Sequence, residues 1–461
     1  MSDLENQKKF ELVLSIGEEL IGIEELNKLI NINAELITYD GFEPSGQMHI
    51  AQGIQRAINV NKMIKAGFKF KMLIADWFGY LNNKMGGDIN KIRAVGEYFI
   101  EIWRASGMDL DNVEFIWTSD MIKDSKYWEL VMKIAKTSSL KRILKTTQIM
   151  GRSENDDLNA SQIIYPCMQV ADIFTLGAQV TQLGMDQRKV NMLAREIGEE
   201  LGFWKPIVVS HHMLKGLGAP VVTYKIEKYT FQHKPHEENV IIVGGYEVKI
   251  SFGEEELNIR FIDISKDKFE SISIDYKQLT NAKGIVELEK KLSVEIRVLS
   301  YNNNTLEVEL KVPNIDLIER AIATKMSKSI PDSAIFMTDN PEEIKRKIIK
   351  AYCPEGIVIE NPVLEYCKYI IFEAHHLKGH EHFLKDGFII KRPDKYGGNK
   401  TYITYIEVEN DFKNKLLFPL DLKNAVIEYI DLLIQPVRSY FFNNNKAGEL
   451  LNKIRDFQIT R

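Results

Sequence analysis

The chain has 461 residues, of which 44% are hydrophobic and 27% are charged, and it contains 13 prolines. This composition excludes a disordered or fibrous protein, and the length predicts two or three domains. The net charge of -5 excludes a uniformly basic protein, so a nucleic-acid partner would have to be held by local basic surfaces.

Cysteine usage and the start of the chain indicate a compartment. Cys167, Cys353 and Cys367 are too few and too scattered for a disulfide framework or a metal knuckle. The acidic start "MSDLENQKK" does not resemble a signal peptide, and no apolar run approaches the roughly 20 residues that a membrane span needs. We therefore expect a cytoplasmic protein that is neither secreted nor bound to a membrane.

Short apolar runs alternate with longer periodic runs in the first part of the chain. After a segment with helical spacing at 14–30, "AELITYD" predicts a strand at 34–40, and "MHIAQGIQRAINVNKMIKAG" predicts a helix at 48–67 that stops at Gly67. This alternation predicts an α/β fold with a Rossmann-like, doubly wound parallel sheet. The elements that continue it are a strand at 68–76, a helix at 89–107 and a strand at 112–119.

Two later regions differ from this pattern. In residues 218–320, stretches such as "EVKISF", "LNIRFIDI" and "TLEVELKV" alternate apolar with polar residues and predict an inserted, antiparallel β-rich module. Residues 355–461 return to helical spacing and predict a separate α-helical C-terminal domain. The Rossmann-like domain then comprises residues 1–217 and 321–354.

The stretch "YDGFEPSGQMHIAQG" follows the first predicted strand of the sheet. In a doubly wound sheet this loop faces the ligand crevice, and the next helix presents its amide N–H groups to anions. His49 at the helix start would donate to phosphate oxygens, while Gly41, Ser45 and Gly46 would let the backbone approach a nucleotide closely. The alternative is a histidine that packs or caps the helix after an ordinary turn.

A second stretch, "ATKMSKSIPDSAIF", places Lys325 and Lys328 on one loop with Ser327 between them. Two mobile ammonium groups suit a pyrophosphate leaving group, because phosphoryl chemistry depends mostly on positioning and charge neutralisation. The alternative is a solvated surface loop. Together with the first stretch, however, this loop favours a site for ATP.

The motifs "HIAQ" and "KMSKS" resemble the two signature motifs of class I aminoacyl-tRNA synthetases. The resemblance implies an enzyme that activates an amino acid with ATP and Mg²⁺, without a metal site of its own, and transfers it to tRNA. It assigns catalytic roles to His49, Lys325 and Lys328. Ala51 and Gln52 stand where the family often has glycine and a second histidine, so no role is carried over to them.

The stretch "YPCMQVADIFTLGAQVTQLGMDQRKVNMLARE" resembles the tyrosine-binding stretch of tyrosyl-tRNA synthetases of the archaeal and eukaryotic type. By this resemblance, Tyr39 and Asp172 hold the substrate phenol. A carboxylate in apolar company is costly to bury unless it is hydrogen-bonded, and a phenol is a suitable partner; the alternative is that Asp172 caps a helix. The other implied contacts are Tyr165, Gln169 and Gln187 to the α-amino group, Gly184 and Asp186 near the ATP ribose, and Gly41, Ser45, Gly46, His49, Lys325, Ser327 and Lys328 around the rest of ATP.

Basic and aromatic residues indicate where tRNA would lie. The resemblance places Lys145 and Arg188 near the first base pair of tRNA, although each would equally suit a solvated helix face. In the C-terminal domain, "IKRPDKYGGN" and "FPLDLKNA" resemble anticodon-reading segments, which assigns stacking to Tyr396 and a base contact to Asp421, with Phe418 beside it. Asp421 would also suit a helix N-cap. The basic run "IKRKIIKAYCP" permits phosphate contact or simple solubility.

The resemblance as a whole implies a tyrosine–tRNA ligase with tRNA(Tyr), L-tyrosine and ATP as partners, no membrane or DNA partner, and a homodimeric assembly. A tryptophanyl-tRNA synthetase shares both motifs, but the pair of Tyr39 and Asp172 argues against it. A catalytically silent paralogue that binds RNA and a small-substrate nucleotidylyltransferase are further alternatives. The module at 218–320 does not match the family; it would contact tRNA, bind a partner or be a tolerated insertion.

Overall fold

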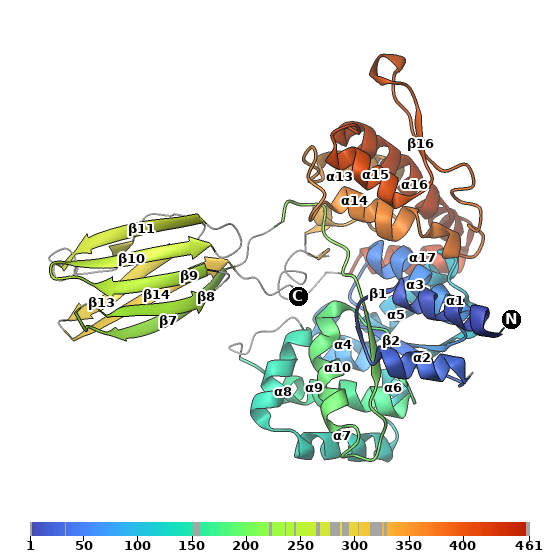
Figure 1. The fold of residues 1–461 in the computed structure, drawn as a ribbon. Helices are drawn as coiled ribbons and strands as arrows, with labels where there is room; N and C mark the ends of the chain where they lie inside the picture. Colours follow the sequence, from blue (N-terminus) through green and yellow to red (C-terminus); the bar gives the residue numbers. More distant parts are fainter. Residues whose placement is uncertain are drawn as a thin grey trace. The chain divides into compact units, whose positions relative to one another are not determined.

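The chain forms two compact units, Met1–Ala219 with Lys325–Arg461, and Pro220–Thr324. They are seen in the computed structural model (Figure 1). Each unit has a separate set of buried hydrophobic residues, so each is described by itself. The described residues are 2–32, 34–150, 157–220, 224–235, 237–243, 246–263, 268–276, 286–287, 295–302, 304–313, 325–326 and 330–457.

A six-stranded sheet in the order β1-β6-β5-β2-β3-β4 forms the centre of the first unit. Five strands are parallel, as predicted, and β1 pairs antiparallel with β6 at the edge. The strand order reverses between β2 and β5, and such a switch point opens a ligand crevice at the carboxyl ends of the strands. The strands are β1 (Gly17–Ile21), β2 (Ile37–Phe42), β3 (Lys69–Ile74), β4 (Val113–Trp117), β5 (Val180–Thr181) and β6 (Ile207–His211).

The N-terminal segment differs from the continuous helical spacing that was expected. Helix α1 (Ser2–Leu14) and helix α2 (Ile23–Asn31) are separated by strand β1. Leu20, which counted toward the helical pattern, lies on β1 opposite Val209. The prediction was wrong because β1 is short and lies between two helices, so its leucine falls close to the helical repeat of its neighbours. The conformation of β1 is determined by its pairing with β6, which the sequence does not show.

The helix predicted at 48–67 begins as a π-helical turn, η1 (Ala51–Gln55), and continues as α3 (Arg56–Lys65). It ends before Gly67, which adopts the left-handed φ of +93° that suits glycine after a helix. The predicted stop is therefore confirmed. The other helices of this part are α4 (Asp76–Leu81), α5 (Ile89–Ala105), α6 (Thr118–Met121), α7 (Ser125–Thr137), α8 (Leu140–Thr146), α9 (Ala160–Thr175) and α10 (Arg188–Ile197).

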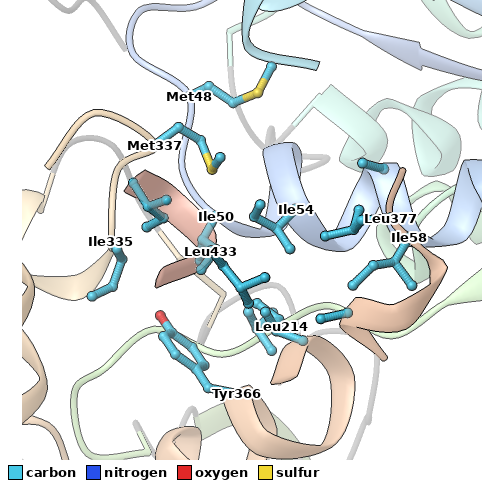
Figure 2. Packing of buried hydrophobic residues seen from close by; sticks show 14 of the residues in the cluster. Met48, Ile50, Ile54, Ile58, Leu214, Ile335, Met337, Tyr366, Leu377 and Leu433 are labelled. Atoms are coloured by element: carbon cyan, nitrogen blue, oxygen red, sulfur yellow. The ribbon is translucent and has the colours of Figure 1, made fainter. Parts of the chain in front are cut away.

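The C-terminal part is mainly helical, as predicted, and its core is continuous with that of the sheet. Figure 2 shows Ile50, Ile54 and Leu214 lying beside Leu433 and Tyr366, which come from the C-terminal helices. This region therefore packs as part of the first unit. Its elements are α13 (Pro341–Lys350), α14 (Pro362–Tyr366), the π-helical turn η7 (Cys367–Ile371), the hairpin β15 (Phe388–Ile390) and β16 (Lys400–Tyr402), α15 (Tyr405–Lys413), α16 (Pro419–Asn443) and α17 (Asn445–Arg455).

The second unit is a β-rich module of two four-stranded antiparallel sheets, β11-β10-β9-β8 and β12-β13-β14-β7. Alternate residues such as Leu257, Ile259 and Phe261 on β10 are buried, as the period of two predicts. Strands β7 and β8 were not among the predicted ones. The strands are β7 (Tyr224–Gln232), β8 (Glu238–Val243), β9 (Tyr246–Phe252), β10 (Glu256–Asp263), β11 (Lys268–Asp275), β12 (Val286–Glu287), β13 (Glu295–Asn302) and β14 (Thr305–Pro313).

Among the described helices, none combines the length and the apolar character that crossing a bilayer requires.

Candidate active site

A cavity of about 600 Å³ opens at the switch point of the sheet. Strand β2 and the loop after it contribute one wall, α9 a second, and the segments after β5 and β6 a third. Gly46 does not line the cavity, and Ser327 and Lys328 lie outside the described residues. The candidate residues that line it are Tyr39, Gly41, Ser45, His49, Tyr165, Gln169, Asp172, Gly184, Asp186, Gln187 and Lys325.

Asp172 lies at the deep, aromatic end of the cavity. It is buried within α9 rather than at a helix start, so it is not a helix cap. The Tyr127 hydroxyl donates to its Oδ1 atom at 2.8 Å. The Oδ2 atom and the Tyr39 hydroxyl are both buried and have no hydrogen-bond partner among the described residues. Polar atoms buried in this way are costly unless a ligand completes them.

The electrostatics of this end follow from burial. Burial raises the pKa of Asp172 to about 8, and the hydrogen bond from Tyr127 opposes that rise. Burial and the nearby Asp172 raise the pKa of Tyr39 well above its ordinary value. Sequence reasoning missed Tyr127, because an aromatic residue on the buried face of α7 is indistinguishable from a core residue until α7 packs against α9.

Polar groups gather around the middle of the cavity. The Gln169 Nε2 atom donates to Gln187 Oε1 at 3.0 Å, which ties α9 to the loop before α10. The Tyr165 hydroxyl donates to Glu43 Oε1 at 2.5 Å, and Lys84 Nζ lies 3.6 Å from the other oxygen of Glu43. Sequence reasoning missed Glu43, although it stands in the same loop as Ser45. A carboxylate beside a tyrosine hydroxyl and a carboxamide is suited to hold an ammonium group.

His49 and the segment that follows Lys325 meet in space, although His49 and Phe336 are far apart in the sequence. Ile50 N donates to Ile335 O at 2.8 Å, and Met337 N donates to Met48 O at 2.9 Å. His49 is thereby paired with Phe336 in an antiparallel bridge. Figure 2 shows the side chains of Met48, Ile50, Ile335 and Met337 at this contact. Backbone hydrogen bonds on both sides therefore determine the position of His49.

Lys325 lines the same cavity from a different segment of the chain. Its Nζ atom lies 2.9 Å from Asp186 Oδ2, and this carboxylate raises the pKa of Lys325. The backbone of Lys325 pairs with Lys215 in an isolated antiparallel bridge. The ammonium group and His49 thus line the same cavity, which is the arrangement that binding of a triphosphate requires.

A fully buried guanidinium, Arg56, forms the floor below this region. Its Nη2 atom lies 3.0 Å from Asp40 Oδ2 and 2.7 Å from the His211 ring nitrogens, and Nη1 donates to Gln182 Oε1. Burial raises the pKa of Asp40 to about 6 against the opposing effect of Arg56. Burial and Arg56 lower the pKa of His211 well below its ordinary value, so this ring is neutral. Sequence reasoning missed Arg56, which is one of several polar residues that α3 buries; Asn59, Asn61 and Lys62 are others.

None of the residues matched to tRNA contacts lines the cavity, and they differ in accessibility. Lys145 is exposed in the last turn of α8. Arg188 is not a free helix-face cation, because its Nε–H is shared between the two carboxylate oxygens of Glu19, each at 2.8 Å. Tyr396 and Phe418 are exposed. The alternative that Asp421 is the N-cap of α16 is wrong, because Phe418 occupies that position. Asp421 lies in the first turn of α16, where the helix dipole favours a carboxylate.

The basic run after the Lys325 loop forms ion pairs within the protein. Lys347 is buried and lies 2.6 Å from Asp339 Oδ2, and Arg346 Nη2 lies 2.7 Å from Asp332 Oδ1. Lys347 is therefore a structural residue. Within the described residues, no group of three or more histidine, cysteine or acidic side chains is arranged to hold a metal ion.

Comparison with known proteins identifies the family. The family model described as "tRNA synthetases class I (W and Y)" matches residues 31–219 and 297–435. The chain is 42% identical over 460 residues to tyrosine–tRNA ligase 1, cytoplasmic, of Arabidopsis thaliana, which covers 99% of this chain and 90% of that protein. The chain belongs to the tyrosine–tRNA ligases. The tyrosine–tRNA ligase of Thermococcus kodakarensis is 34% identical, with 99% of both chains covered.

Solved structures agree with this membership. The tyrosyl-tRNA synthetase of Pyrococcus horikoshii, solved with L-tyrosine, superposes with a TM-score of 0.70 at 30% identity and covers 97% of this chain and 99% of its own. The tryptophanyl-tRNA synthetase of Aeropyrum pernix reaches 0.52 at 14% identity and shares the fold alone. The tyrosine–tRNA ligases of the archaeal and eukaryotic type therefore include this chain, and its activity is tyrosine–tRNA ligation. The family model leaves residues 220–296 unmatched but resumes at 297, and the alignment with the Arabidopsis ligase covers 99% of this chain, so the prediction that the module at 218–320 does not match the family is wrong.

Proposed function

We propose a division of labour within the cavity for the activation of L-tyrosine by Mg-ATP. Asp172 Oδ2 accepts the hydrogen bond of the substrate phenol, and the Tyr39 hydroxyl supports it. Glu43, Tyr165, Gln169 and Gln187 hold the α-amino group. The observation that carries this proposal is the pair of buried, unsatisfied polar atoms on Asp172 and Tyr39, because a phenol is the group that satisfies both.

The nucleotide lies at the other end of the same cavity in this proposal. Gly184 and Asp186 contact the ribose, Gly41 and Ser45 line its path, and Mg²⁺ enters with ATP as part of the substrate. A carboxylate oxygen of tyrosine attacks the α-phosphorus, the bond from that phosphorus to the bridging oxygen breaks, and pyrophosphate leaves. His49, Lys325 and Lys328 stabilise the growing phosphate charge, with Ser327 beside them. A terminal ribose hydroxyl of tRNA then attacks the carbonyl carbon of the adenylate, and AMP leaves.

Lys325 must change partners during this reaction. In this structure its ammonium group is paired with Asp186, the residue proposed for the ribose. Binding of ATP gives each of them a new partner, a hydroxyl for the carboxylate and a phosphate for the ammonium group. The exchange favours binding because both charges remain satisfied.

The partner of the aminoacyl group is proposed to be tRNA(Tyr). Exposed Lys145 would contact the acceptor end, and Arg188 would do so once it leaves Glu19. In the C-terminal part of the chain, Tyr396 and Phe418 would offer exposed aromatic side chains for stacking on anticodon bases. Asp421 would offer a carboxylate for a hydrogen bond to the edge of a base. The relative of Arabidopsis is named cytoplasmic, which supports a cytoplasmic location for this chain.

A homodimer is proposed from the surface of α7. Trp128 and Met132 lie one turn apart on this helix, Leu140 starts the next helix, and all three are exposed. An apolar stripe of this kind on a folded protein indicates an interface, and two copies of one surface form a two-fold dimer.

Pyrophosphate–ATP exchange tests the division of labour. The purified protein is expected to exchange label with tyrosine and not with phenylalanine or tryptophan. Tyr39→Phe is expected to lower the preference for tyrosine over phenylalanine. Exchange that phenylalanine supports as well as tyrosine, in the wild-type protein, would show that Asp172 does not read the phenol.

A further inference from the structure

The segment from His212 to Lys215 follows β6 and has two sides. On one side His212, Met213 and Leu214 line the cavity. On the other side the segment contacts Glu18 of β1 and Glu365 of α14. A wall of the site is therefore supported from behind by an element of the C-terminal part of the chain.

Glu365 makes three contacts with this segment from a largely buried position. Its Oε2 atom accepts a hydrogen bond from the backbone N–H of Lys215 at 3.0 Å and lies 3.1 Å from His212 Nε2. Its Oε1 atom lies 3.5 Å from Lys215 Nζ. The carboxylate of Glu365 thus contacts the backbone of Lys215 and the side chains of both His212 and Lys215. Charge-assisted hydrogen bonds at such a site restrict geometry more strongly than neutral ones.

The segment leads directly to the two motifs of the site. The backbone of Lys215 pairs with that of Lys325, and the His212 carbonyl accepts a hydrogen bond from Gln55 Nε2 at 3.1 Å, on the turn that follows His49. The hydroxyl of Tyr366, next to Glu365 on α14, lies 4.0 Å from the sulfur of Met326. A shift of Glu365 would therefore be transmitted to Lys325 and Met326.

We propose that Glu365 is a positioning residue for tyrosine activation: from α14 it holds residues 212–215, and through them it sets the distance of Lys325 from the nucleotide. The inference rests on the proposed function, because it assumes that Lys325 acts on ATP. Glu365 does not line the cavity, so its effect must pass through the segment.

The charge state of His212 reports on this arrangement. The groups that face His212 are Glu18 from β1, Glu365 from α14, Tyr369 from η7, which stacks on the ring at 4.3 Å between centroids, and the neighbouring neutral His211. Lys215 and Lys368 face the carboxylates of this cluster.

Burial alone would lower the pKa of His212, but Glu18 and Glu365 override it and raise the pKa to about 9. The ring is then doubly protonated at neutral pH and donates to both carboxylates. Because the folded-state pKa is raised, the stabilisation is complete below the unfolded pKa and is lost as the pH rises through about 9.

The test is tyrosine-dependent pyrophosphate–ATP exchange between pH 6 and pH 10. Glu365→Gln is expected to raise the KM for ATP about tenfold and to leave the KM for tyrosine within about twofold, since only the nucleotide end is displaced. It is also expected to move the alkaline fall of activity to lower pH, because His212 loses a carboxylate. In His212→Gln, a neutral hydrogen-bond donor replaces the imidazole ring. The part of the alkaline decrease in activity that is caused by deprotonation of His212 is then expected to disappear.

Glu360→Gln is the matched control, because Glu360 Oε1 lies 3.5 Å from Lys215 Nζ, whereas the Lys215 backbone N–H and His212 Nε2 contact Glu365. It removes the same charge from the same neighbourhood and is expected to leave the KM for ATP within about twofold. Thermal unfolding establishes that each variant is folded.

The inference would be overturned if folded Glu365→Gln has an unchanged KM for ATP, or if its KM values for ATP and for tyrosine rise equally. If Glu365→Gln does not fold, His212→Gln decides, and an unaltered alkaline limb overturns it. Absence of tyrosine-dependent exchange in the wild-type protein would instead overturn the proposed function.

Discussion

Individual buried groups in the cavity are costly for the fold and useful for the reaction. Asp172 is the clearest case, because it is buried, has a protein partner for only one of its oxygens, and has a pKa of about 8. The pKa of Asp172 is higher in the folded state than in the unfolded state. Between about pH 4 and pH 8, folding therefore requires that this carboxyl group binds a proton. The free energy of unfolding contributed by this group therefore falls as the pH rises through that window.

Asp172→Asn is expected to separate stability from activity. The amide stays neutral, so the variant should have a higher free energy of unfolding than the wild type at pH 8 and a smaller difference at pH 5. It presents one acceptor fewer to the phenol, so kcat/KM for tyrosine should fall about tenfold to a hundredfold. Urea unfolding at both pH values and pyrophosphate exchange measure the two effects. Exchange equal to wild type would remove Asp172 from tyrosine recognition.

His49 is proposed to act on the transition state rather than on tyrosine binding. His49→Ala is expected to lower kcat for pyrophosphate exchange about a hundredfold and to change the KM for tyrosine less than about twofold. His375→Ala removes an exposed histidine elsewhere and serves as the control. A variant that loses tyrosine affinity and rate in equal measure would indicate that His49 shapes the tyrosine pocket instead.

At the scale of elements, one contact joins the first signature motif to the segment that follows the second. The backbone around His49 pairs with Ile335 and Met337, and Met337 is fully buried against Gly53 of η1. A Cβ atom placed on Gly53 would collide with the Met337 sulfur. Glycine suits this position because an added side chain would force the buried Met337 side chain to move.

Gly53→Ala is expected to lower the free energy of unfolding by about 1–3 kcal/mol through overpacking. In a Met337→Ala background the same change should cost less, because the space is then vacant. Urea unfolding of the four proteins of this double-mutant cycle measures the coupling. Strictly additive losses would show that the two residues do not compete for one space.

The exposed face of α7 makes a second prediction at this scale. Met132→Glu puts a charge in the middle of the proposed interface and is expected to convert a dimer into a monomer, as measured by sedimentation equilibrium. Lys133→Glu changes the neighbouring solvated position, where Lys133 is paired with Glu129, and is the control. Dimers that persist in Met132→Glu would locate the interface elsewhere.

The whole molecule consists of two units whose buried cores are separate. The second unit leaves the first after Ala219 and the chain returns at Lys325. These ends are close, since Lys325 pairs with Lys215, and Leu217 N donates to Ser333 O at 2.9 Å. The first unit therefore does not need the second to close its chain.

Replacement of residues 220–324 by a Gly/Ser linker of about six residues is expected to leave a folded protein, because the loop closure it demands costs little. Pyrophosphate exchange should stay within about fivefold of the full chain, and aminoacylation of tRNA, measured in parallel, reports any contribution of the module to RNA binding. Loss of exchange in a folded variant would show that the module contributes to the cavity.

Some features of the molecule follow from local pattern. The alternation of apolar runs predicted β2, β3, β4, α5 and the end of the helix at Gly67, because burial on a sheet or on one helix face imposes a fixed period on the residues involved. The same reasoning failed for β1, whose short run between two helices has no period of its own.

The amino-acid sequence by itself determined the α/β order of the elements and the β-rich insertion. Its two signature motifs and its tyrosine-binding stretch also determined the family. Only the tertiary structure decided which groups share the cavity: Tyr127 on Asp172, Glu43 on Tyr165, Arg56 below Asp40, and Glu365 behind Lys215. The physical reason is that a periodic pattern reports how much of a residue is buried. The partner of a buried polar atom comes from a distant element and is known only once the elements pack.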